Sequence, residues 1–368
     1  MRLLEAGRRA AAATMAFLIT IAVWPPPAHA DQVRNGQWYL ADLKIAQAHQ
    51  VTRGAGVTVG VIDSGVWAGH PDLKNAVMPG YDALGKGDAR QDPDGHGTGM
   101  AGVIAGRGRS GGKGVLGIAP EAKILPTAPA LGSLAVIKSL DWSVEHGAKV
   151  INMSFLVLEG DGLAAAIRRA ADADVVLVAG SGNDEESETE DYEYPAAYPE
   201  VIAVGASDRN GKVASFSHQG PHLDLVAPGA DVTVANGFPD DEYDQVEGTS
   251  VSAAIVSGAA ALIRSEYPEL SAAQVVEALE STAVDKGPAG RDDAYGNGEL
   301  DLIAALDAAG KMKPQPVASA AASKPRTVPR SGSHSEDSGI PVALLAGAGV
   351  LVLAGLVAFM VVRRRARL

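Results

Sequence analysis

Three polar residues at the ends of apolar segments have the types that nucleophilic catalysis uses. Asp63 follows the apolar run 56–62, His96 precedes an apolar helical segment, and Ser250 begins another. A serine hydroxyl needs a base within hydrogen-bond reach to become a strong nucleophile, and imidazole has the pKa for that task. A carboxylate can hold the imidazole in one tautomer and stabilise its charged form. The chemistry is that of acyl transfer, provided that the fold gathers the three side chains.

Each of these residues, taken alone, also has a structural interpretation. An aspartate that closes a strand is usually a turn or cap residue, and a serine at a helix start is usually an N-cap. A single histidine on a first helical turn is more often structural than catalytic. Only the combination of the three, in the order Asp, His, Ser along one chain, favours catalysis.

Short apolar runs alternate with segments of helical period between residues 31 and 310. The runs that resemble buried strands are 56–62, 122–125, 148–153, 175–178 and 201–204. The helical segments are 98–106, 132–146, 162–172, 250–266 and 271–281. The alternation predicts an α/β fold with a mostly parallel central sheet and helices on both faces. Chemistry in such folds lies beyond the carboxyl ends of the strands, which is where Asp63 falls.

The three motifs together resemble the signature segments of the subtilase family of serine proteases. They are Val61-Ile62-Asp63-Ser64-Gly65-Val66, Asp94-Gly95-His96-Gly97-Thr98 and Gly248-Thr249-Ser250. The resemblance covers about residues 50–305 and implies a subtilisin-like peptidase domain, which we expect at 55–310. It implies that Ser250 is the nucleophile, that His96 is the base and that Asp63 orients the imidazole.

A fourth segment, 178–183, resembles the oxyanion-hole motif of the same family. The resemblance places Asn183 as a side-chain donor to the developing oxyanion. The backbone N–H of Ser250, at a helix start, is expected to be the second donor.

Two further segments resemble the family's edges for binding a substrate peptide as an added strand. One edge contains Gly132 and Ser133, and the other is Ser154-Phe155-Leu156. Leu156 stands where the family has a glycine, so the sequence predicts a narrower or differently oriented groove.

The resemblance also places Glu193 at the base of the pocket for the side chain before the scissile bond. A carboxylate there predicts a preference for Arg or Lys. The alternative is that the acidic segment around it is only a solvated loop.

The two ends of the chain carry targeting signals. Residues 1–30 combine arginines, an apolar stretch and a small-residue cleavage site, which predicts a secretory signal peptide, with an uncleaved anchor as the alternative. An N-terminal extension (31–54) precedes the peptidase domain. After the peptidase domain, the sequence predicts a Pro/Ser/Ala-rich stalk (311–339), a transmembrane helix (340–362) and a basic cytoplasmic tail (363–368). The catalytic domain of this single-pass protein of the cell membrane is therefore expected to be extracytoplasmic.

Composition excludes several other classes of protein. The formal net charge is −13, and the acidic excess lies in residues 31–310, which would repel a nucleic acid. The chain has no cysteine, so it has neither disulfides nor thiolate metal sites. We expect no cofactor or metal; calcium is possible, but no specific ligand motif supports it.

The predicted order of signal peptide, N-terminal extension, peptidase domain, stalk, transmembrane helix and basic tail resembles that of the mycosins. These are the membrane-anchored subtilases of type VII secretion systems. That resemblance implies a few specific protein or peptide substrates and a partner role with the secretion membrane complex. A different class of function stays open, namely a scaffold that stabilises this complex while its proteolysis is incidental or lost. A broad nutritional protease is less compatible with a membrane anchor.

Overall fold

The computed structural model describes residues 32–83, 85, 87–129, 132–183, 194–238 and 241–315. The predicted signal peptide, Glu193, almost all of the stalk, the transmembrane segment and the basic tail lie outside these ranges. Within the described residues, no helix combines the length and the apolar character that a bilayer span requires.

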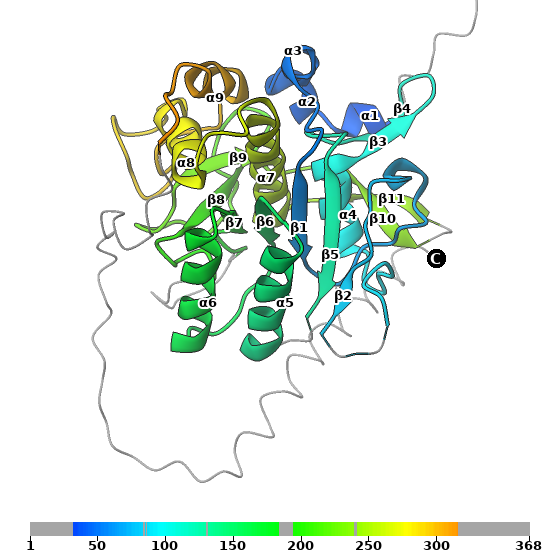
Figure 1. The fold of residues 1–368 in the computed structure, drawn as a ribbon. Helices are drawn as coiled ribbons and strands as arrows, with labels where there is room; N and C mark the ends of the chain where they lie inside the picture. The colour runs from blue at the N-terminus through cyan, green and yellow to red at the C-terminus, as the bar shows by residue number, and fades with distance from the viewer. Residues whose placement is uncertain are drawn as a thin grey trace, which may run out of the picture. The chain divides into compact units, whose positions relative to one another are not determined.

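A seven-stranded sheet forms the centre of the domain, and its strands pair in parallel (Figure 1). In spatial order the strands are β2 (Tyr81–Asp82), β5 (Lys123–Ala128), β1 (Thr58–Ile62), β6 (Val150–Met153), β7 (Val176–Gly180), β8 (Val201–Ser207) and β9 (Leu225–Pro228). The predicted α/β fold with a mostly parallel sheet is therefore confirmed.

Helices cover both faces of this sheet. On one face lie α5 (Ser133–Glu145) and α6 (Asp161–Asp172), and on the other lie α4 (His96–Ala105), α7 (Thr249–Glu266), α8 (Ala272–Ser281) and α9 (Leu302–Ala309). Strand β1 shows how the two cores divide: Val59 and Val61 contribute to the core beneath α4 and α7, whereas Ile62 contributes to the core beneath α5 and α6. Alternate side chains of a strand face opposite sides, so both faces of the sheet must be apolar.

Helix α7 packs against strands β6 to β9 of the sheet and is almost entirely buried. Alanine, glycine and serine make up most of it, so its backbone can approach its neighbours closely. At Gly258, for example, a Cβ atom would lie 2.5 Å from Cβ of Ile118. This close packing fixes the position of the first turn of α7, which contains Ser250.

The N-terminal extension is folded onto the domain as three short helices, α1 (Gln32–Gly36), α2 (Tyr39–Asp42) and α3 (Ile45–Val51). The side chain of Tyr39 is fully buried in the core beneath α4 and α7. Gln37 receives a hydrogen bond from the backbone N–H of Leu116 and donates one to its carbonyl, at 2.8 and 2.9 Å. The indole N–H of Trp38 donates to the carbonyl of Ala230. The extension is therefore part of the folded unit.

Two hairpins complete the described domain. They are β3 (Arg107–Arg109) with β4 (Lys113–Leu116), and β10 (Val232–Phe238) with β11 (Asp241–Val246). The carboxylate of Asp72, in the 3-10 turn η1 (Pro71–Leu73), is buried between them. It accepts hydrogen bonds from Arg109 of the first hairpin and Tyr243 of the second, both at 2.9 Å. This contact fixes both hairpins to the loop that follows β1.

Candidate active site

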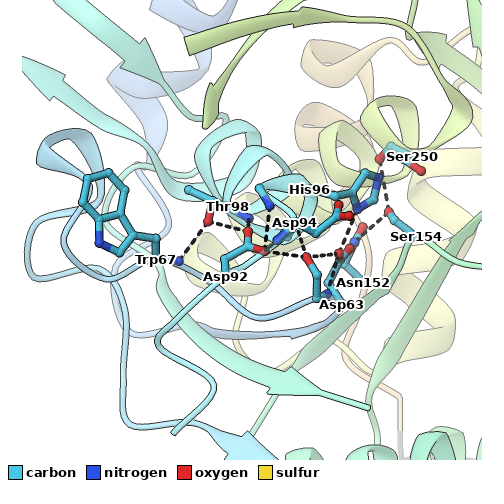
Figure 2. A network of polar contacts seen from close by, with 12 residues as sticks. Asp63, Trp67, Asp92, Asp94, His96, Thr98, Asn152, Ser154 and Ser250 are labelled. Atoms are coloured by element: carbon cyan, nitrogen blue, oxygen red, sulfur yellow. Dashed lines mark hydrogen bonds and ion pairs between the residues drawn. The ribbon is translucent and has the colours of Figure 1, made fainter. Parts of the chain in front are cut away.

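Asp63 and His96 come together at the carboxyl edge of the sheet (Figure 2). Asp63 directly follows β1, where its backbone N–H donates to the carbonyl of Thr127 on the neighbouring strand. His96 is the first residue of α4. Its Nδ1 lies 2.8 Å from Oδ1 of Asp63, and the two side chains are 37% and 4% exposed. Since a carboxylate only accepts hydrogen bonds, Nδ1 carries the proton and Nε2 is left to act on another group.

The charge of Asp63 also changes the acidity of the imidazole. It raises the pKa of His96 to about 9, and the more distant charges of Asp94 and Asp92 act in the same direction, while burial opposes them. The carboxylate thus makes the imidazole a stronger base than a free histidine.

Ser250 is the second residue of α7 and lies beside the imidazole ring of His96 in Figure 2. Its side chain and that of His96 are not joined by a hydrogen bond among the described contacts. In unliganded sites such bonds are often long and tighten only when substrate binds. The helix start is held by Gly248, whose φ of 155° lies at the edge of the left-handed region that favours glycine.

Asn183 follows β7 and is fixed by the same helix start. The backbone N–H and the hydroxyl of Thr249 both donate to Oδ1 of Asn183, at 2.8 and 3.0 Å. These two donors settle the orientation of the amide, because its oxygen must face them. The Nδ2 group makes no hydrogen bond among the described contacts and can donate to a ligand.

Of the two predicted peptide-binding edges, the one that contains Ser154 contacts the start of α7. Gly132 is the exposed N-cap of α5, and Ser133 is its first residue. Ser154 is 8% exposed and its hydroxyl donates to the carbonyl of Ser250 at 3.2 Å. Phe155 packs against the core beneath α5 and α6, whereas Leu156 is 54% exposed. An apolar side chain therefore projects into solvent where the resemblance called for a glycine. Glu193, which was assigned to the pocket base, lies outside the described residues.

The structure adds residues that sequence reasoning did not single out. Asn152, the polar residue of β6, donates to the hydroxyl of Ser154 at 2.9 Å and accepts a hydrogen bond from the hydroxyl of Ser257 at 3.0 Å. Asp92 is 6% exposed and binds the loop that leads into α4. A polar residue inside the apolar run 148–153 and an acidic residue four positions before His96 were the available signals.

No group of three or more His, Asp or Glu side chains in the described part of the chain is arranged to hold a metal ion.

A parallel α/β sheet with an aspartate, a histidine and the start of a buried helix at its carboxyl edge defines the class of subtilisin-like hydrolases. Residues 54–298 match the subtilase family (Peptidase_S8). The chain belongs to this family and is a subtilisin-like serine protease.

Sequence and structure comparisons place it near two groups of relatives. It is 39% identical over 275 residues to subtilisin DY of Bacillus licheniformis, covering 72% of this chain and 95% of that protein. The crystal structure of MycP1 with its N-terminal propeptide removed superposes with a TM-score of 0.67 at 31% identity, covering 76% of this chain and 99% of MycP1. The structure of the MycP3 protease from the type VII (ESX-3) secretion system gives a TM-score of 0.64 at 32% identity, over 73% and 87% of the two chains. The predicted resemblance to subtilases and mycosins is confirmed.

Proposed function

We propose that this protein is a membrane-anchored, extracytoplasmic serine endopeptidase whose catalytic residues are Asp63, His96 and Ser250. The observation that supports this most directly is the 2.8 Å contact between Nδ1 of His96 and Asp63, with Ser250 beside the same ring. The amide of Asn183, oriented by Thr249, supports an oxyanion hole next to the same serine.

The chemistry follows from these positions. His96 takes the proton of the Ser250 hydroxyl through Nε2 as the oxygen attacks the peptide carbonyl. Nδ2 of Asn183 and the N–H of Ser250 stabilise the negative charge that develops on the carbonyl oxygen. The imidazolium then gives its proton to the leaving amine. Water repeats the sequence on the acyl-enzyme and releases the second product.

Labelling with a fluorophosphonate tests the nucleophile. We expect the purified full-length protein to be modified at Ser250 and Ser250→Ala to lose both labelling and peptide hydrolysis. Ser252→Ala is a matched control, because Ser252 lies on the same helix but its buried hydroxyl faces the carbonyls of Ala227 and Pro228, at 2.9 and 3.1 Å, and donates its hydrogen there. Labelling that persists in Ser250→Ala, or an unlabelled wild-type protein, would contradict the assignment.

We propose a mycosin-like role for this protease, with a few specific protein or peptide substrates and a place beside a type VII secretion membrane complex. The order of signal, peptidase domain, stalk and span supports the proposal, as does the similarity to MycP1 and MycP3. The competing role is that of a scaffold. Secretion should fail both in a deletion strain and in a strain that carries Ser250→Ala; rescue of secretion by Ser250→Ala would favour the scaffold.

The specificity proposal concerns Glu193 and Leu156. A carboxylate at the pocket base would favour Arg or Lys before the scissile bond, and the exposed Leu156 would limit how closely the substrate backbone approaches. Profiling with a peptide library should show cleavage after basic residues that decreases in Glu193→Gln. Equal or better cleavage after Leu or Phe would contradict it. Leu156→Gly should broaden the accepted sequences.

A further inference from the structure

The buried carboxylate of Asp92 organises the start of α4. Its Oδ1 accepts the backbone N–H groups of Gly95 and Asp94, at 2.8 and 3.2 Å. Its Oδ2 accepts the backbone N–H and the hydroxyl of Thr98, at 2.8 and 2.6 Å. Both oxygens thus bind the segment on which His96 lies, and Figure 2 shows Asp92 between Thr98 and Asp63.

Asp92 also reaches the aspartate that pairs with His96, through the hydroxyl of Ser64. That oxygen lies 2.8 Å from Oδ1 of Asp92 and 3.2 Å from Oδ1 of Asp63, and it accepts the backbone N–H of Gly97 at 3.0 Å. A serine hydroxyl has one hydrogen to donate, so it serves one carboxylate at a time. The shorter distance assigns the hydrogen to Asp92.

We propose that Asp92 is a positioning residue that draws the hydroxyl hydrogen of Ser64 away from Asp63, so that the charge of Asp63 is directed at His96. The inference rests on the proposed catalytic role of Asp63 and His96. It assigns to Asp92 a function beyond shaping the loop: it determines how many hydrogen bonds Asp63 receives.

The physical reason is competition for one oxygen atom. Oδ1 of Asp63 already accepts the backbone N–H of Ser64 at 2.8 Å and the Nδ1–H of His96 at 2.8 Å. A further donor at the same oxygen would stabilise the carboxylate by itself and weaken its attraction for the imidazolium. The charges that act on His96 are those of Asp63, Asp94 and Asp92, and all three raise its pKa. Loss of the Asp92 carboxylate should therefore lower the pKa of His96 in two ways. It removes a negative charge near the imidazole, and it lets the Ser64 hydroxyl turn towards Asp63 and donate its hydrogen there.

Asp92→Asn separates these two effects when it is compared with Asp94→Asn. The amide keeps the shape of Asp92 but has only one acceptor oxygen for five donors. Asp94 is exposed and its carboxylate makes no hydrogen bond among the described residues, so Asp94→Asn removes a nearby charge alone. NMR titration of His96 in the full-length chain should show a lower pKa in both variants. The decrease in Asp92→Asn should be larger by about one unit, which corresponds to one ordinary hydrogen bond.

Ser64→Ala removes the hydroxyl, and therefore tests whether the additional decrease in the pKa of His96 comes from it. In Asp92→Asn/Ser64→Ala the additional decrease should disappear, because no hydroxyl is left to turn. In Ser64→Ala alone the pKa of His96 should stay close to the wild-type value; a clear rise would mean that the hydroxyl already donates to Asp63, and would overturn the proposal. Equal decreases in Asp92→Asn and Asp94→Asn, with both variants folded by their melting curves, would also overturn it.

The Ser64→Ala measurement decides the question even if Asp92→Asn does not fold. Since the readout is the titration of one imidazole, it does not depend on proteolysis. A wild-type protein that fails to react with the fluorophosphonate would count against the proposed function and leave this test intact.

Discussion

The imidazole of His96 links the rate and the stability of this protein to pH in opposite directions. Its pKa in the folded protein is raised to about 9, chiefly by the charge of Asp63. The stabilisation from the charged pair is therefore fully present below about pH 6.5, the ordinary pKa of histidine, and is lost as the pH rises through about 9. The neutral imidazole is the form that accepts the proton of Ser250, so hydrolysis should increase over the same alkaline interval.

Measurement of kcat/KM against pH checks this expectation. The acidic limb should have its midpoint well above 6.5, and in Asp63→Asn this midpoint should decrease together with the rate, because the amide carries no charge. An acidic limb at or below pH 6.5 in the wild-type protein would contradict it. Asp94→Asn, a more distant charge, serves as the control with a smaller shift.

The amide of Asn183 should contribute to the rate without contributing much to ground-state binding. Asn183→Ala is expected to lower kcat by about 10²–10³ with little change in KM, since the oxyanion forms only in the transition state. Asn183→Asp is a stricter variant, because it places a negative charge beside the oxyanion and should lower kcat further. A proportional rise in KM with constant kcat would instead indicate a role in substrate binding.

Among the elements, the short N-terminal helices α2 and α3 bury apolar side chains in the core, so we expect them to contribute to the stability of the domain. Tyr39 is fully buried and its hydroxyl accepts a hydrogen bond from Gln37 at 2.7 Å. We expect Tyr39→Ala to lower the free energy of unfolding by about 3–5 kcal/mol, as for other buried aromatic residues. Chemical denaturation of the full-length protein measures this loss. Val51→Ala, at a side chain that is 47% exposed on α3, is the control and should change stability by less than about 1 kcal/mol.

The longer elements could be predicted from the sequence because their apolar periodicity extends over several turns or a whole strand. The observed bounds of α4 to α8 differ from the predicted segments by at most two residues. Helices α1 to α3 contain only four to seven residues each, too few to show a period, and tertiary contacts such as those of Gln37 stabilise them. The hairpins were not predicted for a different reason: they depend on contacts between distant residues, such as those of Asp72 with Arg109 and Tyr243, which no local pattern shows.

In the candidate site, too, the residues that lie in local sequence motifs could be predicted, whereas the contacts between residues distant in the chain could not. Asp63, His96, Asn183 and Ser250 each lie in a short motif, so the sequence alone suggests them. The contact between Asp92 and Ser64 joins residues 28 positions apart, and that between Ser257 and Asn152 joins residues 105 apart. Such partners depend on the register of the sheet and the packing of α7, which the local sequence does not specify.

At the scale of the whole molecule, the predicted transmembrane helix determines in which cell fraction we expect to find the protein. Expressed in full, the protein should be recovered with membranes and should require detergent for release. Deletion of residues 340–368 should move it to the soluble extracytoplasmic fraction with its peptidase activity retained, because α9 and residues 310–315 end the described domain without them. Membrane association that survives the deletion would place the anchor elsewhere.

The C-terminal end of the described domain lies near α3 and the end of α7. Helix α3 packs against α9, and Gln274 holds the last described residues through hydrogen bonds with the carbonyl of Lys313 and the N–H of Gln315, at 2.8 and 3.0 Å. The hydroxyl of Thr52 donates to that of Ser265, near the end of α7. Ser250 is 15 residues away on the same helix, a rise of about 22 Å along its axis. Arg264, also near the end of α7, donates to the carbonyl of Leu270, close to Gln274 in the chain. The last described residues therefore lie near the C-terminal end of α7, whereas Ser250 lies at its N-terminal end, so a chain that continues from residue 315 starts well away from the candidate nucleophile.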